Sequence, residues 1–185
     1  MLMEDIQYDL YRITGKIDGW TFIKTLFSNR AFRRLYYYRK YRQNGRVGKK
    51  VISILSHMLF TKMSIELPWS IELGKGVLLL HPYSITFNSK TIIGDNCTIM
   101  KGVTIGNTKG PNGGTPIIGN NVYIGLNATV IGNIHIGNNV LIAPNSFVNF
   151  DVPDGALVIG NPGVVHKKEK ASSLYIVNSI EEMRT

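Results

Sequence analysis

An aliphatic residue recurs at every sixth position through the second half of this 185-residue chain. Ordinary alternating strands would repeat every two residues instead. Six residues are enough for one short strand and one turn, and three such units close a triangular coil of about 18 residues. The series runs without a miss through Ile118, Ile124, Val130, Ile136, Ile142 and Val148.

The same six-residue period continues upstream with two interruptions. One run joins Ile93, Ile99 and Ile105, and another joins Leu73, Leu79 and Ile85. Two extra residues are expected between Ile85 and Ile93, and a glycine-rich excursion at 106–117 separates Ile105 from Ile118. About twelve hexapeptides result, which predicts a mainly β fold, a parallel β-helix of about four coils over residues 63–165.

The charge is distributed unevenly along the chain. The formal net charge is +9, and residues 1–62 hold 13 Lys and Arg against 4 Asp and Glu. Residues 63–185 hold eight of each kind. We therefore expect a basic, aromatic helical region at 1–62, a neutral β-helix domain at 63–165 and a tail at 166–185.

Two helices are expected in the basic region. One spans 20–42, with an apolar stripe of Trp20, Ile23, Phe27, Ala31, Leu35 and Tyr38, and one spans 48–62. Basic helices with aromatic residues are typical of membrane-interface segments, and packing on the β-helix is the alternative. No DNA- or RNA-binding motif accompanies them, so no nucleic-acid partner is expected.

The cysteine count, the first residues and the length of the apolar runs bear on the cellular location of the protein. The single cysteine, Cys97, permits no intrachain disulfide. The first fifteen residues lack the pattern of a secretory signal, and no apolar run approaches the roughly 20 residues needed to cross a bilayer. A cytoplasmic location is expected, with peripheral attachment to the inner membrane face as an option.

Residues 65–165 resemble a known family. The motifs are "IELGKGVLLLH", "KTIIGDNCTIMKGVTIG", the glycine-rich excursion and "DVPDGALVIGNPGVV". Together they resemble the left-handed β-helix hexapeptide-repeat acetyltransferases, in the serine acetyltransferase-like branch and closest to polysaccharide and sugar O-acetyltransferases. The resemblance implies a left-handed β-helix, a homotrimer, and acetyl-CoA as co-substrate in a groove between neighbouring β-helices.

The resemblance also assigns a catalytic pair. His81 matches the family's general base, which removes the proton of the acceptor hydroxyl as the oxygen attacks the thioester. Imidazole is the side chain best matched to this task near neutral pH. Glu66 lies fifteen residues earlier, where the family has an aspartate that orients the ring.

Further site residues follow from the same match. Backbone N–H groups at Gly106 and Asn107 would bind the thioester or the developing oxyanion. Gly125 and Ala143 would pass close to the pantetheine arm of CoA, and Lys167 and Lys168 would pair with its phosphates. A solvated basic tail is the alternative for the two lysines.

The acceptor site departs from the serine enzymes. They have Asp before the catalytic His and an Arg-His pair before the loop-closing Pro, where this chain has Leu80, Gly114 and Thr115. Losing the partners of a zwitterion weakens its binding sharply. We therefore expect a sugar or polysaccharide precursor as the acceptor. Its binding residues would be Tyr83, Asn88 and Thr115.

Three alternatives remain beside this prediction. Serine O-acetylation is the runner-up among enzymes, and a non-catalytic trimeric β-helix scaffold is the alternative of another class. A zinc site of the kind found in some β-helical enzymes needs three convergent histidines, and only His81 lies in the right region. No metal is therefore expected.

Overall fold

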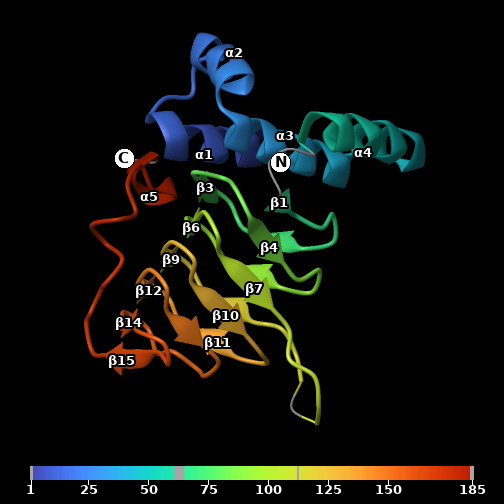
Figure 1. Ribbon diagram of the computed structural model, residues 1–185. Helices are drawn as coiled ribbons and strands as arrows, with labels where there is room; N and C mark the ends of the chain where they lie inside the picture. Colours follow the sequence, from blue (N-terminus) through green and yellow to red (C-terminus); the bar gives the residue numbers. More distant parts are fainter. Residues whose placement is uncertain (1, 61–64, 112, 184–185) are drawn as a thin grey trace.

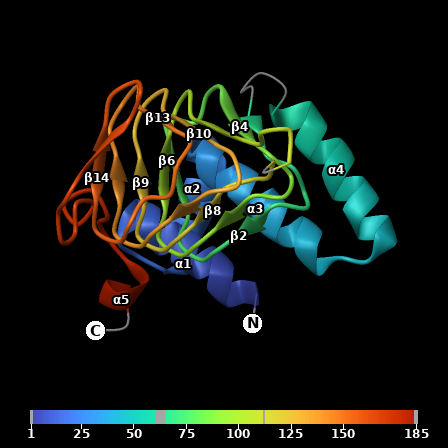
Figure 2. The same cartoon turned by 90° about the horizontal axis from the view of Figure 1, so that it is seen from below.

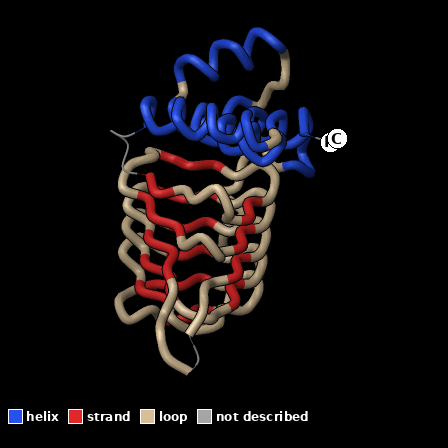
Figure 3. Tube along the Cα trace, turned by 90° about the vertical axis from the view of Figure 1, so that its right-hand side faces the viewer, coloured by secondary structure: helices blue, strands red, loops and turns tan. Residues whose placement is uncertain are grey.

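The structure, a computed structural model, describes residues 2–60, 65–111 and 113–183. It contains a stack of triangular coils with helices over one end (Figures 1 and 3). The expected boundary between residues 62 and 63 lies outside the described residues. Asn112, in the glycine-rich excursion, also lies outside them.

Three sheets form the walls of the stack. Sheet 1 contains β1 (Ile65–Glu66), β4 (Ile85–Phe87), β7 (Thr104–Gly106), β10 (Thr129–Ile131) and β13 (Phe147–Val148). Sheet 2 contains β2 (Glu72–Leu73), β5 (Ile92–Ile93), β8 (Ile117–Ile118) and β11 (His135–Ile136). Sheet 3 contains β3 (Leu78–Leu80), β6 (Thr98–Met100), β9 (Tyr123–Ile124), β12 (Leu141–Ile142), β14 (Leu157–Ile159) and β15 (Val164–His166).

The expected left-handed parallel β-helix is confirmed. Each strand pairs in parallel with the strand one coil away, and only β15 runs antiparallel, against β14. The stack has about five turns, one more than the hexapeptide count indicated. The additional turn consists of positions that the count left out, because β1 pairs with β4 at one end, and Val152 and β14 pair with the preceding coil at the other.

The six-residue period reflects inward stacking. In sheet 1, Phe87 pairs with Ile105, Ile105 with Val130, and Val130 with Val148, and all four are buried. Each buried side chain rests on its equivalent in the next coil, so burial of apolar area stabilises every step. The fully buried Cys97 lies in the same core, and burial raises the pKa of its thiol to about 12.

The two extra residues lie elsewhere than expected. The register pairs Leu79 with Ile99, 20 positions on, but Phe87 with Ile105, only 18 positions on. The insertion therefore falls in the turn 81–84 and not between Ile85 and Ile93. From the sequence, Ile85 continues the period because it is apolar and lies six residues after Leu79. In the structure Ile85 is also buried, but Phe87 is the residue in register with Ile105.

Four helices cover the first coil, and we call them the helical cap. They are α1 (Leu2–Thr14), α2 (Gly19–Ser28), α3 (Arg30–Gln43) and α4 (Arg46–Phe60). The helix expected at 20–42 is two helices, because Asn29 ends α2 and its side chain caps α3 by accepting from Phe32 N–H at 3.0 Å. The sequence analysis missed α1. It also expected 48–62 for α4, of which 61–62 lie outside the described residues.

The α3 helix closes the open end of the β-helix. Its residues Ala31, Leu35 and Tyr38 belong to the β-helix core. The first coil has no preceding coil to pair with, so side chains of α3 donate to its carbonyls instead. Arg34 Nη2 donates to Leu67 O at 2.7 Å, and Tyr38 Oη donates to Ile71 O at 2.6 Å. Part of the basic charge therefore serves the fold.

The chain returns to the helical cap at its end. After β15 the tail runs back along the outside of the coils to α5 (Ile180–Met183), which lies beside α1 (Figures 1 and 2). Ser172 Oγ donates to Asn121 O, and Ile180 N–H donates to Asn96 Oδ1 at 3.0 Å. The tail thus lies along the corner between sheets 2 and 3.

Candidate active site

The turn 81–84 presents His81 at the corner between sheet 3 and sheet 1. His81 directly follows β3, its side chain is exposed, and its φ of +52° lies in the left-handed region. Tyr83 N–H donates to His81 O at 2.8 Å, which closes a compact turn around Pro82. A left-handed φ costs a residue other than glycine about 1–2 kcal/mol. The chain therefore accepts strain where it exposes its candidate base.

Gly125 and Ala143 lie on the same corner in the coils below His81. Gly125 follows β9 and Ala143 follows β12, as His81 follows β3. Gly125 N–H donates to Ile142 O at 2.8 Å, and a Cβ on Gly125 would lie 2.6 Å from Pro144 N. The two residues are therefore stacked on successive coils. The register places these two predicted CoA residues in one column with Leu80, the residue directly before His81.

Lys167 and Lys168 lie at the opposite end of the β-helix. They follow β15 and are exposed, whereas His81 lies beside the helical cap (Figure 1). Four coil steps of about 4.8 Å separate the His81 turn from the last coil, or about 19 Å in total. The antiparallel strand β15 leads back across sheet 3, so the two lysines lie near Gly155, at the corner between sheets 2 and 3 and not at the His81 corner. Their pairing with the phosphates of CoA stays a prediction.

Glu66 lies on the outer face of sheet 1. The register aligns Glu66 with Thr86 and Thr86 with Thr104 across three coils. Gly106 lies on the same face, where it pairs with Ile131. In the part of the chain that the structure describes, no hydrogen bond or ion pair links the Glu66 carboxylate to the His81 ring. The orienting role of Glu66 stays a prediction.

A second group of predicted residues gathers at the far edge of sheet 1. A cavity of about 410 Å³ is lined by Asn88, Lys90, Asn107, Thr115 and neighbouring loop residues. Asn88 Nδ2 donates to Asn107 Oδ1 at 3.0 Å, and Thr115 Oγ1 donates to Lys90 O at 3.2 Å. These side chains lie across sheet 1 from His81, so within one chain only Tyr83 of the predicted acceptor residues accompanies the imidazole.

A larger cavity of about 590 Å³ opens directly beside His81. Four parts of the protein line it, namely the His81 turn, the helical cap, the sheet 3 strands β3, β6 and β9, and the C-terminal tail. The residues are Arg12, Ile13, Asn29, Ala31, Leu78, Leu79, Leu80, His81, Pro82, Tyr83, Thr98, Tyr123, Tyr175, Val177 and Asn178. The rings of Tyr123 and Tyr175 are 4.7 Å apart, and burial together with the Tyr175 charge raises the pKa of Tyr123.

Arg12 is the one arginine or lysine among the residues lining this cavity, and no carboxylate lines it. Its side chain is buried, and it donates to neutral oxygens, including Gly76 O, Val177 O and Thr98 Oγ1. Burial lowers the pKa of the guanidinium, against the opposing effect of Cys97 and of the nearby carboxylates of Glu182, Asp9 and Glu181. A positive charge held in a low-dielectric wall attracts a negative group in the cavity.

The sequence analysis missed Arg12, Tyr123, Tyr175 and Asn178. Tyr123 lies at an outward position of a hexapeptide, like many residues with no role. Arg12 and the two tail residues approach His81 only because α1 and the tail return to the first coils. No local pattern in the sequence indicates that return.

Neither a metal site nor a membrane-spanning helix is present among the residues described. No group of three or more His, Cys, Asp or Glu side chains there is arranged to hold a metal ion. Within the same residues, no helix is both long enough and apolar enough to span a membrane.

Residues 115–149 match the family model described as "Bacterial transferase hexapeptide (six repeats)". The matched residues lie within the β-helix and contain the strands β8 to β13. A serine acetyltransferase of Synechococcus elongatus is 39% identical over 113 residues, which cover 60% of this chain and 46% of that protein. A serine acetyltransferase of Staphylococcus aureus is 38% identical over 130 residues, which cover 70% of this chain and 60% of that protein.

The fold also matches solved structures. Serine acetyltransferase of Neisseria gonorrhoeae has a TM-score of 0.75 at 28% identity, covering 91% of this chain and 67% of that one. The same enzyme in complex with serine gives a TM-score of 0.74 at 27% identity, covering 88% of this chain and 68% of that one. This hexapeptide-repeat chain spans between about half and three fifths of the length of the two curated relatives it matches.

Proposed function

We propose that this chain is an acetyl-CoA-dependent O-acetyltransferase with His81 as its general base. The observation that carries the proposal is the His81 turn. It presents an exposed imidazole beside a cavity, directly after the repeat position at which Gly125 and Ala143 stack below Leu80. The similarity to serine acetyltransferases supports the same assignment.

The proposed reaction is a direct transfer. His81 takes the proton from the acceptor hydroxyl while the oxygen attacks the thioester carbonyl of acetyl-CoA. Backbone N–H groups at Gly106 and Asn107 stabilise the negative oxygen of the tetrahedral intermediate. The C–S bond then breaks, and the imidazolium returns the proton to the departing thiolate of CoA. Glu66 stabilises the imidazolium in this scheme.

L-serine is the acceptor that the comparisons favour. The sugar acceptor expected from the sequence is not supported, because the relatives reported above are serine acetyltransferases and one neighbour is a complex with serine. The cavity beside His81 offers a further reason. Arg12 holds a positive charge behind its wall, which suits the carboxylate of an amino acid although Leu80 replaces the family's aspartate.

A homotrimer would complete the site. In the single chain the outer face of sheet 1 carries Glu66, Thr86 and Gly106, and the Asn88–Asn107 pair lies at its far edge. A neighbouring β-helix against this face would form a groove, and the far-edge residues of one copy would approach the His81 corner of the next. The CoA column would then lie between two copies.

Release of free CoA thiol from acetyl-CoA tests the proposal. The acceptors are L-serine, glycine as an amino acid without a hydroxyl, simple sugars and nucleotide sugars. We expect release with L-serine and loss of about 10²–10⁴-fold in the variant His81→Asn. Release with sugars alone would overturn serine as the acceptor. No release together with no acetyl-CoA binding would assign the chain to the scaffold class.

A further inference from the structure

The helix α4 is amphipathic, but its apolar face is turned away from the core and is exposed. The less exposed face of α4 holds Gly48, Lys49, Ile52, Ser53 and Ser56, and Ser56 is only 4% exposed. The opposite face carries an apolar stripe at helical spacing, with Val47 78% exposed and Met58 72% exposed. The stripe consists of Val47, Val51, Ile54, Leu55 and Met58.

A second stripe of the same kind lies on α2. Phe22 and Leu26 face the protein and pack on the cluster of Ile6, Leu10 and Phe32. Trp20 and Phe27 lie on the other side of the helix and are 75% and 74% exposed. Ile23 is half-exposed between them. The break at Asn29 explains this arrangement, because it separates the outward stripe of α2 from the inward stripe of α3.

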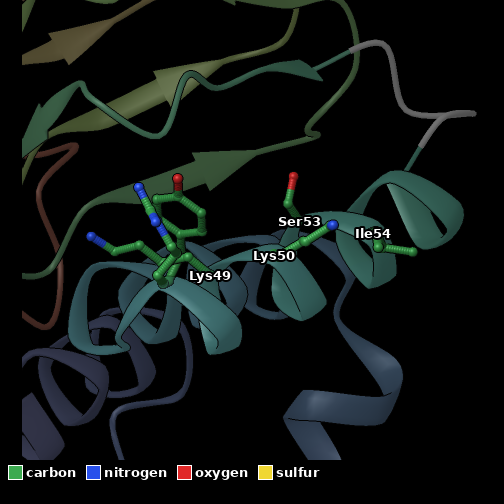
Figure 4. A pocket seen from close by; sticks show the side chains of 6 residues that line it. Lys49, Lys50, Ser53 and Ile54 are labelled. Atoms are coloured by element: carbon green, nitrogen blue, oxygen red, sulfur yellow. The ribbon is translucent and has the colours of Figure 1, made fainter.

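Cations border the α4 stripe on one edge. A hollow of about 590 Å³ there is lined by Arg46, Lys49 and Lys50, with Tyr41, Ser53 and Ile54 (Figure 4). Figure 4 shows Ser53 turned toward the strands of the β-helix. Between Asp18 and Glu66 the sequence holds eleven Lys and Arg and no Asp or Glu. Of these cations, Arg34 and Arg39 are buried.

We propose that the outward stripes of α2 and α4 bind the surface of an anionic lipid bilayer. Apolar side chains enter the interface while Lys and Arg at its edge meet the acidic headgroups, as amphipathic membrane-surface helices do. The charge argues against a second copy of the chain as the occupant. A second helical cap carries the same positive charge, and residues 63–185 have no net negative charge to offer. The proposal does not depend on the acetyltransferase activity.

Co-sedimentation of the full chain with vesicles tests the proposal. The vesicles contain phosphatidylcholine alone or phosphatidylcholine with 30% phosphatidylglycerol. We expect binding to the anionic vesicles, weakened by added NaCl, and a blue shift of tryptophan emission that is absent in Trp20→Phe. No binding to the anionic vesicles, or equal binding to both kinds, would overturn the proposal.

Paired variants locate the surface. Val51→Ser with Met58→Ser should weaken binding roughly tenfold or more, because both side chains lose their apolar burial. The matched control, Ile159→Ser with Val164→Ser, removes two exposed apolar side chains on β14 and β15, at the end of the β-helix opposite the helical cap, and should bind normally. Arg46→Gln with Lys50→Gln should weaken binding about fivefold for each cation, and Lys16→Gln with Lys170→Gln should not.

Thermal unfolding checks that each variant is folded, and light scattering gives the oligomer size without vesicles. Unchanged vesicle binding in both α4 variants would overturn the proposal. A smaller oligomer in Val51→Ser with Met58→Ser would overturn it as well, because it would assign the stripe to contact between copies. Equal loss of binding in the control pair would do the same.

Discussion

The turn that holds His81 and the turns stacked below it all contain residues with a left-handed φ, but the residue types at these positions differ. In the lower turns the left-handed position belongs to Gly102, Asn127 and Asn145, and Asn127 N–H donates to Lys101 O at 3.1 Å. In the turn 81–84, Ser84 holds the equivalent position, and His81 adds a second left-handed residue with an exposed ring. The repeated turns use residues that suit the conformation, whereas the inserted turn does not.

The difference indicates which turns serve the fold and which serves the proposed chemistry. Natural proteins break local rules mainly at functional sites. Here the rule is broken in one turn of this corner, at His81 and Ser84, and His81 also lines a cavity. Substitutions in the two kinds of turn should therefore separate activity from stability.

The variant His81→Asn should produce the largest effect. Asparagine tolerates a left-handed φ, so the turn is kept while the base is lost. We expect kcat to fall about 10²–10⁴-fold with an unchanged midpoint of thermal unfolding. The control His135→Asn changes another exposed histidine, on β11, and should leave kcat as it is. A parallel loss in both variants would contradict the role of His81.

Gly102→Ala should have the opposite profile. The φ of Gly102 is +74°, and an added Cβ would lie 2.0 Å from Asn127 Oδ1 in the turn below. We expect the free energy of unfolding to fall by about 1–3 kcal/mol, measured by urea denaturation. The remaining folded protein should keep its kcat. Gly45→Ala meets nothing within 4 Å and should change neither quantity.

Much of the fold could be predicted because each coil repeats the environment of the previous one. A residue such as Ile124 meets equivalent neighbours above and below, so its period alone indicates its burial. The insertion at 81–84 could not be placed, because Ile85 satisfies the period that Phe87 satisfies in the structure. The break at Asn29 was missed for a similar reason, since the apolar spacing continues across it.

Residues of the candidate site could be predicted from the sequence only where their place follows from the six-residue repeat. His81, Gly125 and Ala143 share one corner because Gly125 and Ala143 hold the repeat position of Leu80, the residue directly before His81. The cavity beside His81 also needs Arg12 and Tyr175, which arrive from opposite ends of the chain. The resemblance therefore indicated the base, while the acceptor side depends on long-range packing that no motif describes.

Tyr175→Ala tests whether the C-terminal tail shapes the acceptor cavity beside the His81 turn, a role that it would not have at the lower turns. Removing the ring from the Tyr123–Tyr175 pair enlarges the cavity beside His81. We expect KM for the acceptor to rise about tenfold, with kcat within twofold and KM for acetyl-CoA unchanged. The adjacent and 89% exposed Leu174 provides the control, Leu174→Ala. Equal changes in both KM values would mean that the ring only supports the fold.

The smallest expected effect is the most direct measure of strain in the inserted turn. Replacing an exposed residue by glycine usually lowers stability by about 0.4–1 kcal/mol, because the unfolded chain gains conformational freedom. At His81 the same change also removes the about 1–2 kcal/mol cost of a left-handed φ. His81→Gly should therefore raise the free energy of unfolding by about 0.5 kcal/mol while abolishing activity. Lys101→Gly, in the next turn of the column, should lower it, since Lys101 has no left-handed φ to relieve. Urea denaturation of the two variants side by side measures the sign, and a loss at both positions would show that the His81 turn is as relaxed as the turns below it.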